Sequence, residues 1–99
     1  MIELIKTASF DRWLRQLRDA SARSRIEARI RRLSLGNPGD VKPVGSGISE
    51  MRIDYGPGYR VYFIAKRPVI VVLLCGGDKS TQSDDISIAK DLARQWEAQ

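Results

Sequence analysis

The feature that most limits how this chain can fold is an alternating pattern on both sides of a Gly-Pro-Gly turn. Polar and apolar side chains alternate along residues 48–55 and again along residues 59–65, which is typical of strands that bury one face. Glycine tolerates the positive φ angles of short turns, and proline presets one turn position. The stretch therefore predicts a β-hairpin whose loop is formed by Gly56, Pro57 and Gly58.

The expected three-residue loop also predicts the register of the hairpin. If Tyr55 faces Tyr59, the further cross-strand pairs are Asp54 with Arg60, Arg52 with Tyr62, and Glu50 with Ile64. One face is then apolar and is expected to pack on helices; it carries Met51, Ile53, Tyr55, Tyr59, Val61 and Phe63. The other face is expected to be open to solvent, with a polar patch of Glu50, Arg52, Asp54, Arg60 and Tyr62.

Helical patterns precede the hairpin. Residues 2–6 are a short strand candidate, and Thr7 is placed to cap a helix that follows. Apolar residues then recur at helical spacing in two groups, interrupted at residues 19–21 and stopped by Gly36 and Pro38: Phe10, Trp13, Leu14 and Leu17, then Ile26, Ile30 and Leu33. The pattern predicts an αα-hairpin, followed by a connecting loop over residues 36–47.

A continuous apolar run after the hairpin predicts a central strand covered on both faces. It extends from Val69 to Leu74, after a turn at residues 66–68. Helical spacing resumes at Ile86, Ala89, Ala93 and Trp96, with Ser83 or a Thr81-x-x-Asp84 box as the helix cap. The order β-α-α-β-β-β-α predicts one α+β domain over residues 1–99, with a mostly antiparallel sheet packed against the αα-hairpin and a C-terminal helix.

Composition limits the function. The net charge of +5 comes mostly from arginine, a side chain suited to phosphate recognition, so the expected partner is a polyanion. The arginines of the two helices can equally be solvated surface residues. Without histidine and with one cysteine, Cys75, the chain lacks the usual zinc ligands, and we expect no metal and no cofactor. Cys75 ends the apolar run and is expected to be a buried thiol.

The sequence also predicts where the protein works. Its longest apolar run is too short to cross a bilayer. The N-terminus lacks the charged and then apolar pattern of a secretion signal. We therefore expect a cytoplasmic protein with no membrane partner.

Basic residues of the hairpin and of a later loop suggest a phosphate site. Arg52 and Arg60 project from the same hairpin face, and Lys79 follows the glycine pair at the end of the central strand. These three are the candidate catalytic residues. Fixed cations stabilise the negative charge that gathers when an RNA 2′-hydroxyl attacks its own phosphodiester. The alternative is a salt-bridged sheet surface in which Asp54 and Glu50 offset the two arginines.

Other residues of this region are candidates for substrate binding and proton transfer. Tyr62 is expected to serve as a stacking platform or proton donor, and the carboxylates of Asp54 and Asp78 are expected to contact the substrate. Arginine does not lose its proton and histidine is missing, so the general base must come from Lys79, Asp54, Asp78 or Tyr62. Gly76 and Gly77 are expected to let another backbone approach closely.

Two stretches, GISEMRIDYGPGYRVYF and LLCGGDKSTQSDDISIAK, together with the order of elements, resemble the RelE/HigB-type toxins of bacterial toxin–antitoxin modules. The resemblance is closest to the subgroup of addiction module killer proteins. It implies an mRNA interferase, an endoribonuclease that usually acts on the ribosome and is held inactive by a cognate antitoxin. In this subgroup the antitoxin typically carries a helix-turn-helix domain, and operator DNA is contacted only through the complex.

The resemblance also assigns residues. Arg52 and Arg60 match basic strand positions that contact the scissile phosphate in ribonuclease members, and Lys79 matches a basic loop position. Near the last helix, where many members carry a functional tyrosine or histidine, this chain has Ser83, Asp84 and Asp85. The general acid and base therefore stay unassigned.

Two other functions fit the same sequence. A ParE-like toxin of the same fold binds DNA gyrase and cleaves nothing, although such proteins usually lack a basic catalytic patch on the sheet. A basic binding module without activity is the third interpretation. The arginine-rich helices and the helix bearing Trp96 are candidate docking surfaces for the antitoxin, whereas Trp96 alone fits a core residue at helical spacing.

Overall fold

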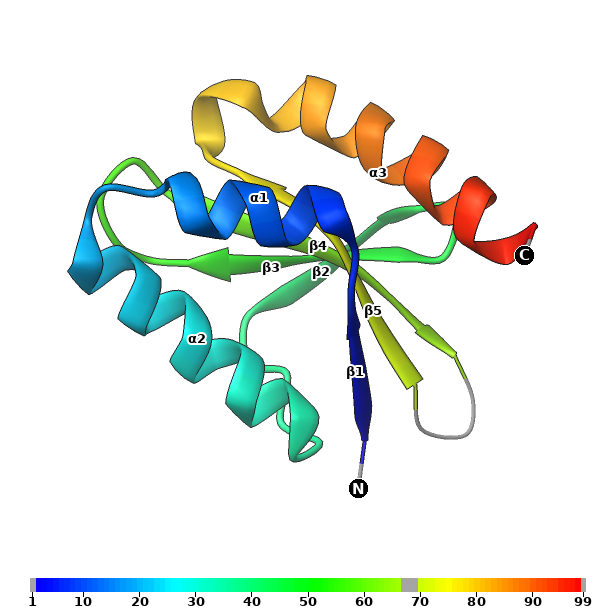
Figure 1. The fold of residues 1–99 in the computed structure, drawn as a ribbon, viewed down its shortest axis with the longest axis horizontal. Helices are drawn as coiled ribbons and strands as arrows, with labels where there is room; N and C mark the ends of the chain where they lie inside the picture. The colour runs from blue at the N-terminus through cyan, green and yellow to red at the C-terminus, as the bar shows by residue number, and fades with distance from the viewer. Residues whose placement is uncertain (1, 67–69, 99) are drawn as a thin grey trace.

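Across residues 2–66 and 70–98, which the computed structural model describes, the chain forms a five-stranded sheet with helices on both faces (Figure 1). The elements are β1 (Glu3–Lys6), α1 (Ala8–Gln16), α2 (Ala20–Ser34), β2 (Val41–Gly45), β3 (Ile48–Ile53), β4 (Tyr59–Lys66), β5 (Ile70–Gly77), the 3₁₀ turn η1 (Lys79–Thr81) and α3 (Gln82–Glu97). The strand order is β1-β5-β4-β3-β2, in which β1 and β5 are parallel and the other pairs antiparallel. This confirms the predicted α+β domain with a mostly antiparallel sheet.

The first two helices begin at capping residues that the sequence supplies. Thr7 Oγ1 accepts a hydrogen bond from the Phe10 amide at 3.1 Å and donates one to the Leu74 carbonyl at 2.6 Å. This cap therefore also fastens α1 to β5. Asp19 caps α2 by accepting from the Ala22 amide at 3.2 Å. The predicted αα-hairpin is confirmed.

Apolar side chains form a core on each face of the sheet. On the side of α1 and α2 the core consists of Phe10, Ile26, Ile30, Leu33, Met51, Ile53, Val61, Phe63, Val71 and Leu73. On the side of α3 it consists of Ile48, Tyr62, Ile64, Val72, Leu74, Cys75, Ala89 and Ala93. Strand β5 contributes to both, so the prediction of a central strand covered on both faces is confirmed, as is the apolar face assigned to the hairpin. In Figure 1, α2 and α3 lie on opposite sides of the strands.

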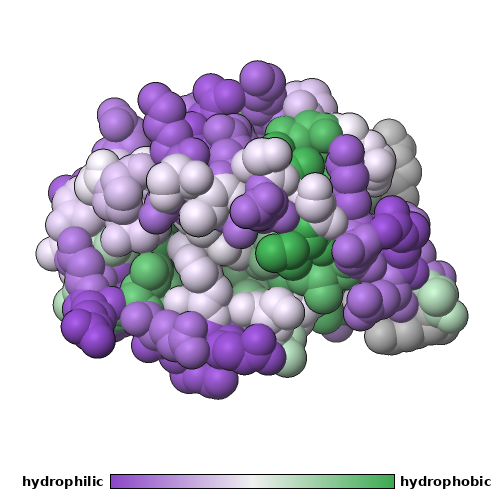
Figure 2. All heavy atoms as spheres, turned by 90° about the horizontal axis from the view of Figure 1, so that it is seen from above, coloured by the Kyte–Doolittle hydropathy of each residue, from purple (hydrophilic) through white to green (hydrophobic). Residues whose placement is uncertain are grey.

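The outer surface is mostly polar. Seen from above, hydrophilic residues cover most of the molecule, with small hydrophobic areas between them (Figure 2). Among the described residues, the large apolar side chains classed as exposed are Leu35, at 74%, and Ile88, at 47%. Within this part of the chain, no helix has the length and apolar composition to pass through a membrane.

The sequence interpretation missed one strand. The expected loop over residues 36–47 contains β2, which pairs antiparallel with β3 and shifts register between Pro43 and Gly45. A proline and few apolar residues are typical of a loop. An edge strand nevertheless accepts proline, because one of its sides needs no partner.

The hairpin loop is longer than expected, which changes the register. Residues 54–58 separate β3 from β4, and the Tyr55 amide turns back to the Ile53 carbonyl at 2.9 Å instead of pairing across the hairpin. The observed partners are Arg52 with Arg60, Glu50 with Tyr62, and Ile48 with Ile64. The expected pairs of Asp54 with Arg60, Arg52 with Tyr62 and Glu50 with Ile64 are wrong. Because the slip is by two residues, each side chain keeps its predicted face.

The end of the sheet differs slightly from the prediction. Strand β5 is described from Ile70 and continues to Gly77, beyond the expected end at Leu74. Residues 67–69, which hold most of the predicted turn and the start of the predicted strand, lie outside the described residues. The longer β5 brings its two terminal glycines into the sheet.

Candidate functional site

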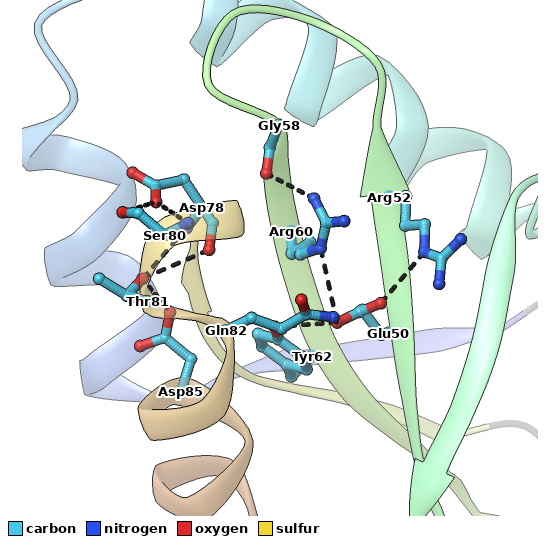
Figure 3. A network of polar contacts seen from close by, with 10 residues as sticks. All are labelled: Glu50, Arg52, Gly58, Arg60, Tyr62, Asp78, Ser80, Thr81, Gln82 and Asp85. Carbon is cyan, nitrogen blue, oxygen red and sulfur yellow. Dashed lines mark hydrogen bonds and ion pairs between the residues drawn. The ribbon is translucent and has the colours of Figure 1, made fainter.

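A buried carboxylate organises the polar end of the hairpin (Figure 3). Glu50 lies on β3 with 0% of its surface exposed. Arg52 Nε donates to its Oε1 at 3.1 Å, while Tyr62 Oη and Gln82 Nε2 donate to its Oε2 at 3.0 and 2.7 Å. Arg60 Nε lies 3.6 Å from Oε2 and forms a second ion pair. The site therefore joins β3, β4 and the first residue of α3.

The two arginines lie opposite each other on β3 and β4. The Arg52 side chain is 35% exposed and that of Arg60 is 12% exposed, so neither stands freely in solvent. Arg60 Nη1 donates to the Gly58 carbonyl at 2.7 Å. Both guanidinium groups turn Nε toward Glu50, and the terminal nitrogens of Arg60 point toward Gly58 (Figure 3). The expected open sheet face is wrong for Glu50, Tyr62 and Arg60, which are buried or mostly covered. It holds only at the edge, where Arg52 is partly exposed and Asp54 is exposed.

Hydrogen bonds keep the central carboxylate charged. Burial alone would raise the pKa of Glu50, but hydrogen bonds from Gln82, Arg52 and Tyr62 and the charge of Arg60 outweigh it. The pKa of Glu50 is therefore lowered from its usual 4.5. The ionised carboxylate offsets the repulsion between the two guanidinium groups.

The loop after β5 forms the second wall of the site. Asp78 accepts hydrogen bonds from the amide and the hydroxyl of Ser80 at 2.8 and 2.5 Å, and so caps η1. The bond from the Ser80 hydroxyl is the main reason that the pKa of Asp78 is lowered. The Lys79 amide donates to the Pro57 carbonyl at 3.4 Å. This contact holds the loop against the hairpin turn.

Gly58 is the point at which Arg60 and Lys79 meet. A Cβ atom added there would lie 3.1 Å from Arg60 Nη1 and 3.4 Å from the Cβ of Lys79. Lys79 itself is exposed. The structure therefore brings together the three predicted catalytic residues, with Arg60 between Arg52 and the stem of Lys79.

The glycine pair at the end of β5 makes room for side chains, and the expected approach of another backbone is wrong. An added Cβ would come within 2.3 Å of the Trp13 ring at Gly76 and within 1.8 Å of Asp85 Oδ2 at Gly77. Gly77 is the cross-strand partner of Arg60. The Asp85 carboxylate therefore lies at the same end of the sheet as the two arginines.

The pKa of Asp85 is raised, in contrast to the pKa values of Glu50 and Asp78. Burial raises its pKa, with further contributions from the charges of Asp78 and Asp84, despite a hydrogen bond from Thr81 Oγ1 at 2.5 Å. Thr81 occupies the cap position of α3 without a side-chain cap bond. The expected caps, Ser83 or a Thr81-x-x-Asp84 box, are therefore wrong.

The structure places the three predicted substrate-binding residues in different surroundings. Tyr62 is completely buried, and burial, followed by the charge of Glu50, raises its pKa. An exposed stacking platform at Tyr62 is wrong, because α3 covers this part of the sheet. Asp78 is occupied as the cap of η1. Asp54 is exposed in the hairpin loop and lines a groove beside α2, apart from the arginine pair.

Cys75 and Trp96 are parts of the core, as predicted. Cys75 is buried, and burial raises the pKa of its thiol to about 12. Trp96 is partly buried and packs on the core beneath α3. Over residues 2–66 and 70–98, no three side chains of His, Cys, Asp or Glu gather as a possible metal site.

Most arginines of the first two helices are exposed, which agrees with the interpretation of a solvated surface. Arg29 is an exception. Its Nη1 donates to the Arg52 carbonyl at 2.5 Å, and its Nη2 donates to the Pro38 carbonyl at 3.2 Å. Arg25 stacks over the Tyr55 ring at 4.5 Å. These contacts fix α2 against β3 and the hairpin loop.

Sequence reasoning missed the roles of Glu50, Gln82 and Asp85. It treated Glu50 as a surface carboxylate and gave Gln82 no role. One signal was available, because Ile48 and Ile64 share the face of Glu50 in an alternating strand. Apolar residues on both faces indicate a second covering layer, and that layer buries the carboxylate between them.

The fold and the site together define a small α+β domain that holds two arginines over a buried carboxylate at one end of its sheet. The family model described as "Phage derived protein Gp49-like (DUF891)" matches residues 12–94, and the chain belongs to this family. A protein of Haemophilus influenzae described as "Uncharacterized protein" is 53% identical over 94 residues, covering 95% of each chain. The family is associated with toxin–antitoxin systems, which is consistent with a toxin that has a cognate antitoxin.

Proposed function

We propose that this protein is the toxin of a type II toxin–antitoxin system and acts as an endoribonuclease on mRNA. The observation that carries the proposal is the arginine pair, Arg52 and Arg60, held side by side over ionised Glu50 with Lys79 at its edge. Two adjacent guanidinium groups suit a phosphodiester, since their hydrogen bonds to phosphate are charge-assisted. The resemblance to RelE/HigB-type toxins supports the same activity.

In the proposed reaction the RNA supplies its own nucleophile. The 2′-oxygen attacks the adjacent phosphorus, and the bond from phosphorus to the 5′-oxygen of the next nucleotide breaks. The products are a 2′,3′-cyclic phosphate and a 5′-hydroxyl end. Negative charge gathers on the non-bridging oxygens, where Arg52 and Arg60 stabilise it. Contacts from both arginines also orient the phosphate, so that the attacking 2′-oxygen stays in line with the phosphorus–5′-oxygen bond that breaks.

Lys79 and Asp85 are the groups best suited to move the two protons. The Asp85 carboxylate takes the proton of the 2′-hydroxyl, and its raised pKa brings it closer to the range in which a carboxylate is an effective base. The Lys79 ammonium gives a proton to the leaving 5′-oxygen. Tyr62 is buried against Glu50, and Asp78, with its lowered pKa, is a weak base.

The partners in this proposal follow from the resemblance. A cognate antitoxin with a helix-turn-helix domain holds the toxin inactive, and the complex binds operator DNA. The substrate is mRNA in the cytoplasm, bound on the ribosome. The positive net charge of +5 is consistent with a nucleic-acid substrate.

The proposal is tested by inducing the protein in cells that lack the antitoxin and mapping mRNA ends by primer extension. Wild type and the control Arg12→Ala, a change at an exposed position of α1, should cut translated mRNA and stop growth. Arg52→Ala should do neither. Uncut mRNA after induction of the wild type would refute the proposal. Repeating the reaction with purified RNA, with and without ribosomes, determines whether the ribosome is required.

A gyrase-binding toxin like ParE is the second candidate. The observation that favours it is the cover over Arg60 and Tyr62, because a surface that only binds a protein needs no open catalytic patch. The double variant Arg52→Ala plus Arg60→Ala separates the two functions in a gyrase supercoiling assay. Inhibition that survives both substitutions supports gyrase binding. Growth unaffected by the free wild-type protein would instead indicate a binding module without toxic activity.

A further inference from the structure

We propose that Glu50 is a positioning residue, which sets the guanidinium groups of Arg52 and Arg60 to receive a single phosphodiester. The inference rests on the proposed function and specifies how that site is built and what charge it accepts. The argument depends on the contacts of the buried carboxylate, on what fixes it, and on the charge of the cluster.

Glu50 holds the two arginines with different oxygens. Arg52 Nε donates to Oε1 at 3.1 Å, and Arg60 Nε lies 3.6 Å from Oε2. Side chains opposed on neighbouring strands are only about 5 Å apart, so the two cations would otherwise repel each other and separate. With both Nε atoms turned to the carboxylate, the terminal nitrogens of Arg60 point toward Gly58 and those of Arg52 point to the side away from Arg60 (Figure 3). Because Arg60 Nη1 donates to the Gly58 carbonyl at 2.7 Å, the donors left for an anion are Arg60 Nη2 and the terminal nitrogens of Arg52.

The carboxylate is itself fixed by groups from two other elements. Tyr62 on β4 and Gln82 at the start of α3 donate to Oε2 at 3.0 and 2.7 Å. Glu50 and Tyr62 are both completely buried. Three donated hydrogen bonds hold this carboxylate in one orientation. The buried Arg60 Nε makes no hydrogen bond and contributes an ion pair at 3.6 Å. The arginine pair is therefore arranged before any substrate arrives, as binding sites require.

The cluster has a charge that matches one class of phosphate. Among Arg52, Arg60 and Glu50, the carboxylate neutralises one arginine and leaves a single net positive charge; at the edge of the site Lys79 adds one positive charge and Asp78 one negative charge. An internal phosphodiester carries one negative charge, whereas a terminal phosphate monoester carries nearly two at neutral pH. The site should therefore accept the internal phosphodiester of an RNA strand in preference to a terminal phosphate.

The test is the binding of a short single-stranded RNA in which 2′-O-methyl groups prevent cleavage, measured by fluorescence anisotropy. Simple electrostatics predicts that Glu50→Gln binds this anion more tightly, because a negative charge is removed. Positioning predicts the opposite, a loss of affinity of about tenfold. In the Arg52→Ala background the same substitution should cost less affinity than in the wild type, because one of the two arginines that Glu50 positions is already gone. The control is Glu27→Gln, the same chemical change at an exposed residue of α2.

Each outcome decides the matter. Unchanged or tighter binding by Glu50→Gln, or an equal loss in the Arg52→Ala background, overturns the proposal. If Glu50→Gln does not fold, Gln82→Ala removes one fixing hydrogen bond without changing the charge and should weaken RNA binding by about threefold. Wild-type affinity in a folded Gln82→Ala protein also overturns the proposal.

A methylated dinucleotide with an internal diester should compete better for the site than a nucleoside monophosphate, and the reverse order contradicts the charge argument. If the predicted pattern holds but wild type cleaves no RNA, the nuclease proposal fails and the positioning role stands.

Discussion

At the scale of single residues, Arg60 links the buried carboxylate to the hairpin turn and to the loop after β5. It pairs with Glu50, donates to the Gly58 carbonyl and lies beside Lys79. A surface arginine could be removed with little effect on folding. Arg60 is mostly covered, so its removal affects both the candidate chemistry and the stability of the buried carboxylate.

Arg60→Ala is expected to lower mRNA cleavage and toxicity by at least about tenfold, because a cation at the phosphate is lost. It should also lower the free energy of unfolding by about 1–3 kcal/mol, because buried Glu50 loses an ion-pair partner. Primer extension and thermal unfolding measure the two effects. Arg94→Ala, at an exposed position of α3, is the control and should change neither. A stable Arg60→Ala protein with wild-type toxicity would show that this side chain is not part of the active site.

Cys75 predicts a loss of stability in alkaline solution. Burial raises the pKa of its thiol from 9.0 to about 12, so the unfolded chain releases this proton at a lower pH than the folded one. The stabilising contribution is complete below pH 9 and falls by about 1.4 kcal/mol per pH unit as the pH rises toward the folded value. Urea unfolding near pH 8 and near pH 10 measures the fall. It should be smaller in Cys75→Ala, and equal falls in both proteins would contradict the assignment.

At the scale of elements, the polar end of the sheet depends on how closely α1 approaches β5. Gly76 has room for no side chain, because the Trp13 ring of α1 occupies the space. The same rim carries Gly77 and Asp85 on the face of the arginines. A side chain added at Gly76 should therefore lower the free energy of unfolding.

Gly76→Ala is expected to lower the free energy of unfolding by about 1–3 kcal/mol, because the added methyl overlaps the indole ring. Thermal unfolding monitored by circular dichroism gives the value. In a Trp13→Leu background the added cost should shrink, since the space is then open. The same cost in both backgrounds would show that Trp13 is not the obstacle.

The two faces of the hairpin give a second prediction at this scale. Met51→Asp or Phe63→Asp should abolish folding, because each places an unpaired charge in the core beneath α1 and α2. Leu35→Asp makes the same kind of change at an exposed apolar residue and should leave the fold intact. Far-ultraviolet circular dichroism distinguishes the outcomes. A folded Met51→Asp protein would mean that the core face of β3 has been wrongly assigned.

Much of the fold could be predicted from the sequence, because local patterns specify it. Alternation, helical spacing and the Thr7 cap were enough for both hairpins and for the central strand. β2 could not be predicted, because a proline-containing edge strand has no periodic signal of its own. The register was missed because the backbone already turns at Asp54, where the Tyr55 amide bonds to the Ile53 carbonyl, before the turn over residues 55–58.

The site was only partly predictable for a different reason. The pairing of Arg52 with Arg60 follows from the hairpin, but the burial of Glu50 and Tyr62 depends on α3, which begins at Gln82 and crosses the sheet from a distant part of the chain. No local pattern gives the position of that helix. The same long-range packing makes Glu50 the centre of the site and removes Tyr62 from the surface.

At the scale of the whole molecule, the chain carries a net charge of +5. Positive charge spread over a surface attracts a polyanion and makes the affinity depend on salt. The exposed arginines of the first two helices contribute to this charge. The affinity for RNA therefore reports on more than the arginine pair.

RNA binding is expected to weaken as salt is added. If two phosphates of a single strand are neutralised, raising the salt from about 50 to about 200 mM should lower affinity by about sevenfold. A salt titration of fluorescence anisotropy with the methylated RNA measures the slope. Arg52→Ala should lower the slope, whereas a flat titration of the wild type would contradict phosphate contact.

The parallel pairing of β1 with β5 places Glu3 opposite Ile70 and Lys6 opposite Leu73. Two segments from distant parts of the chain must therefore meet before all five strands are paired. A growing polypeptide leaves the ribosome from its N-terminus. Its first strand therefore waits unpaired until most of the chain has emerged, and Gln82, which fixes Glu50, emerges later still. An unfinished or truncated chain has neither a closed sheet nor a fixed arginine pair, so the assembled site can form only after the residues up to Gln82 have emerged.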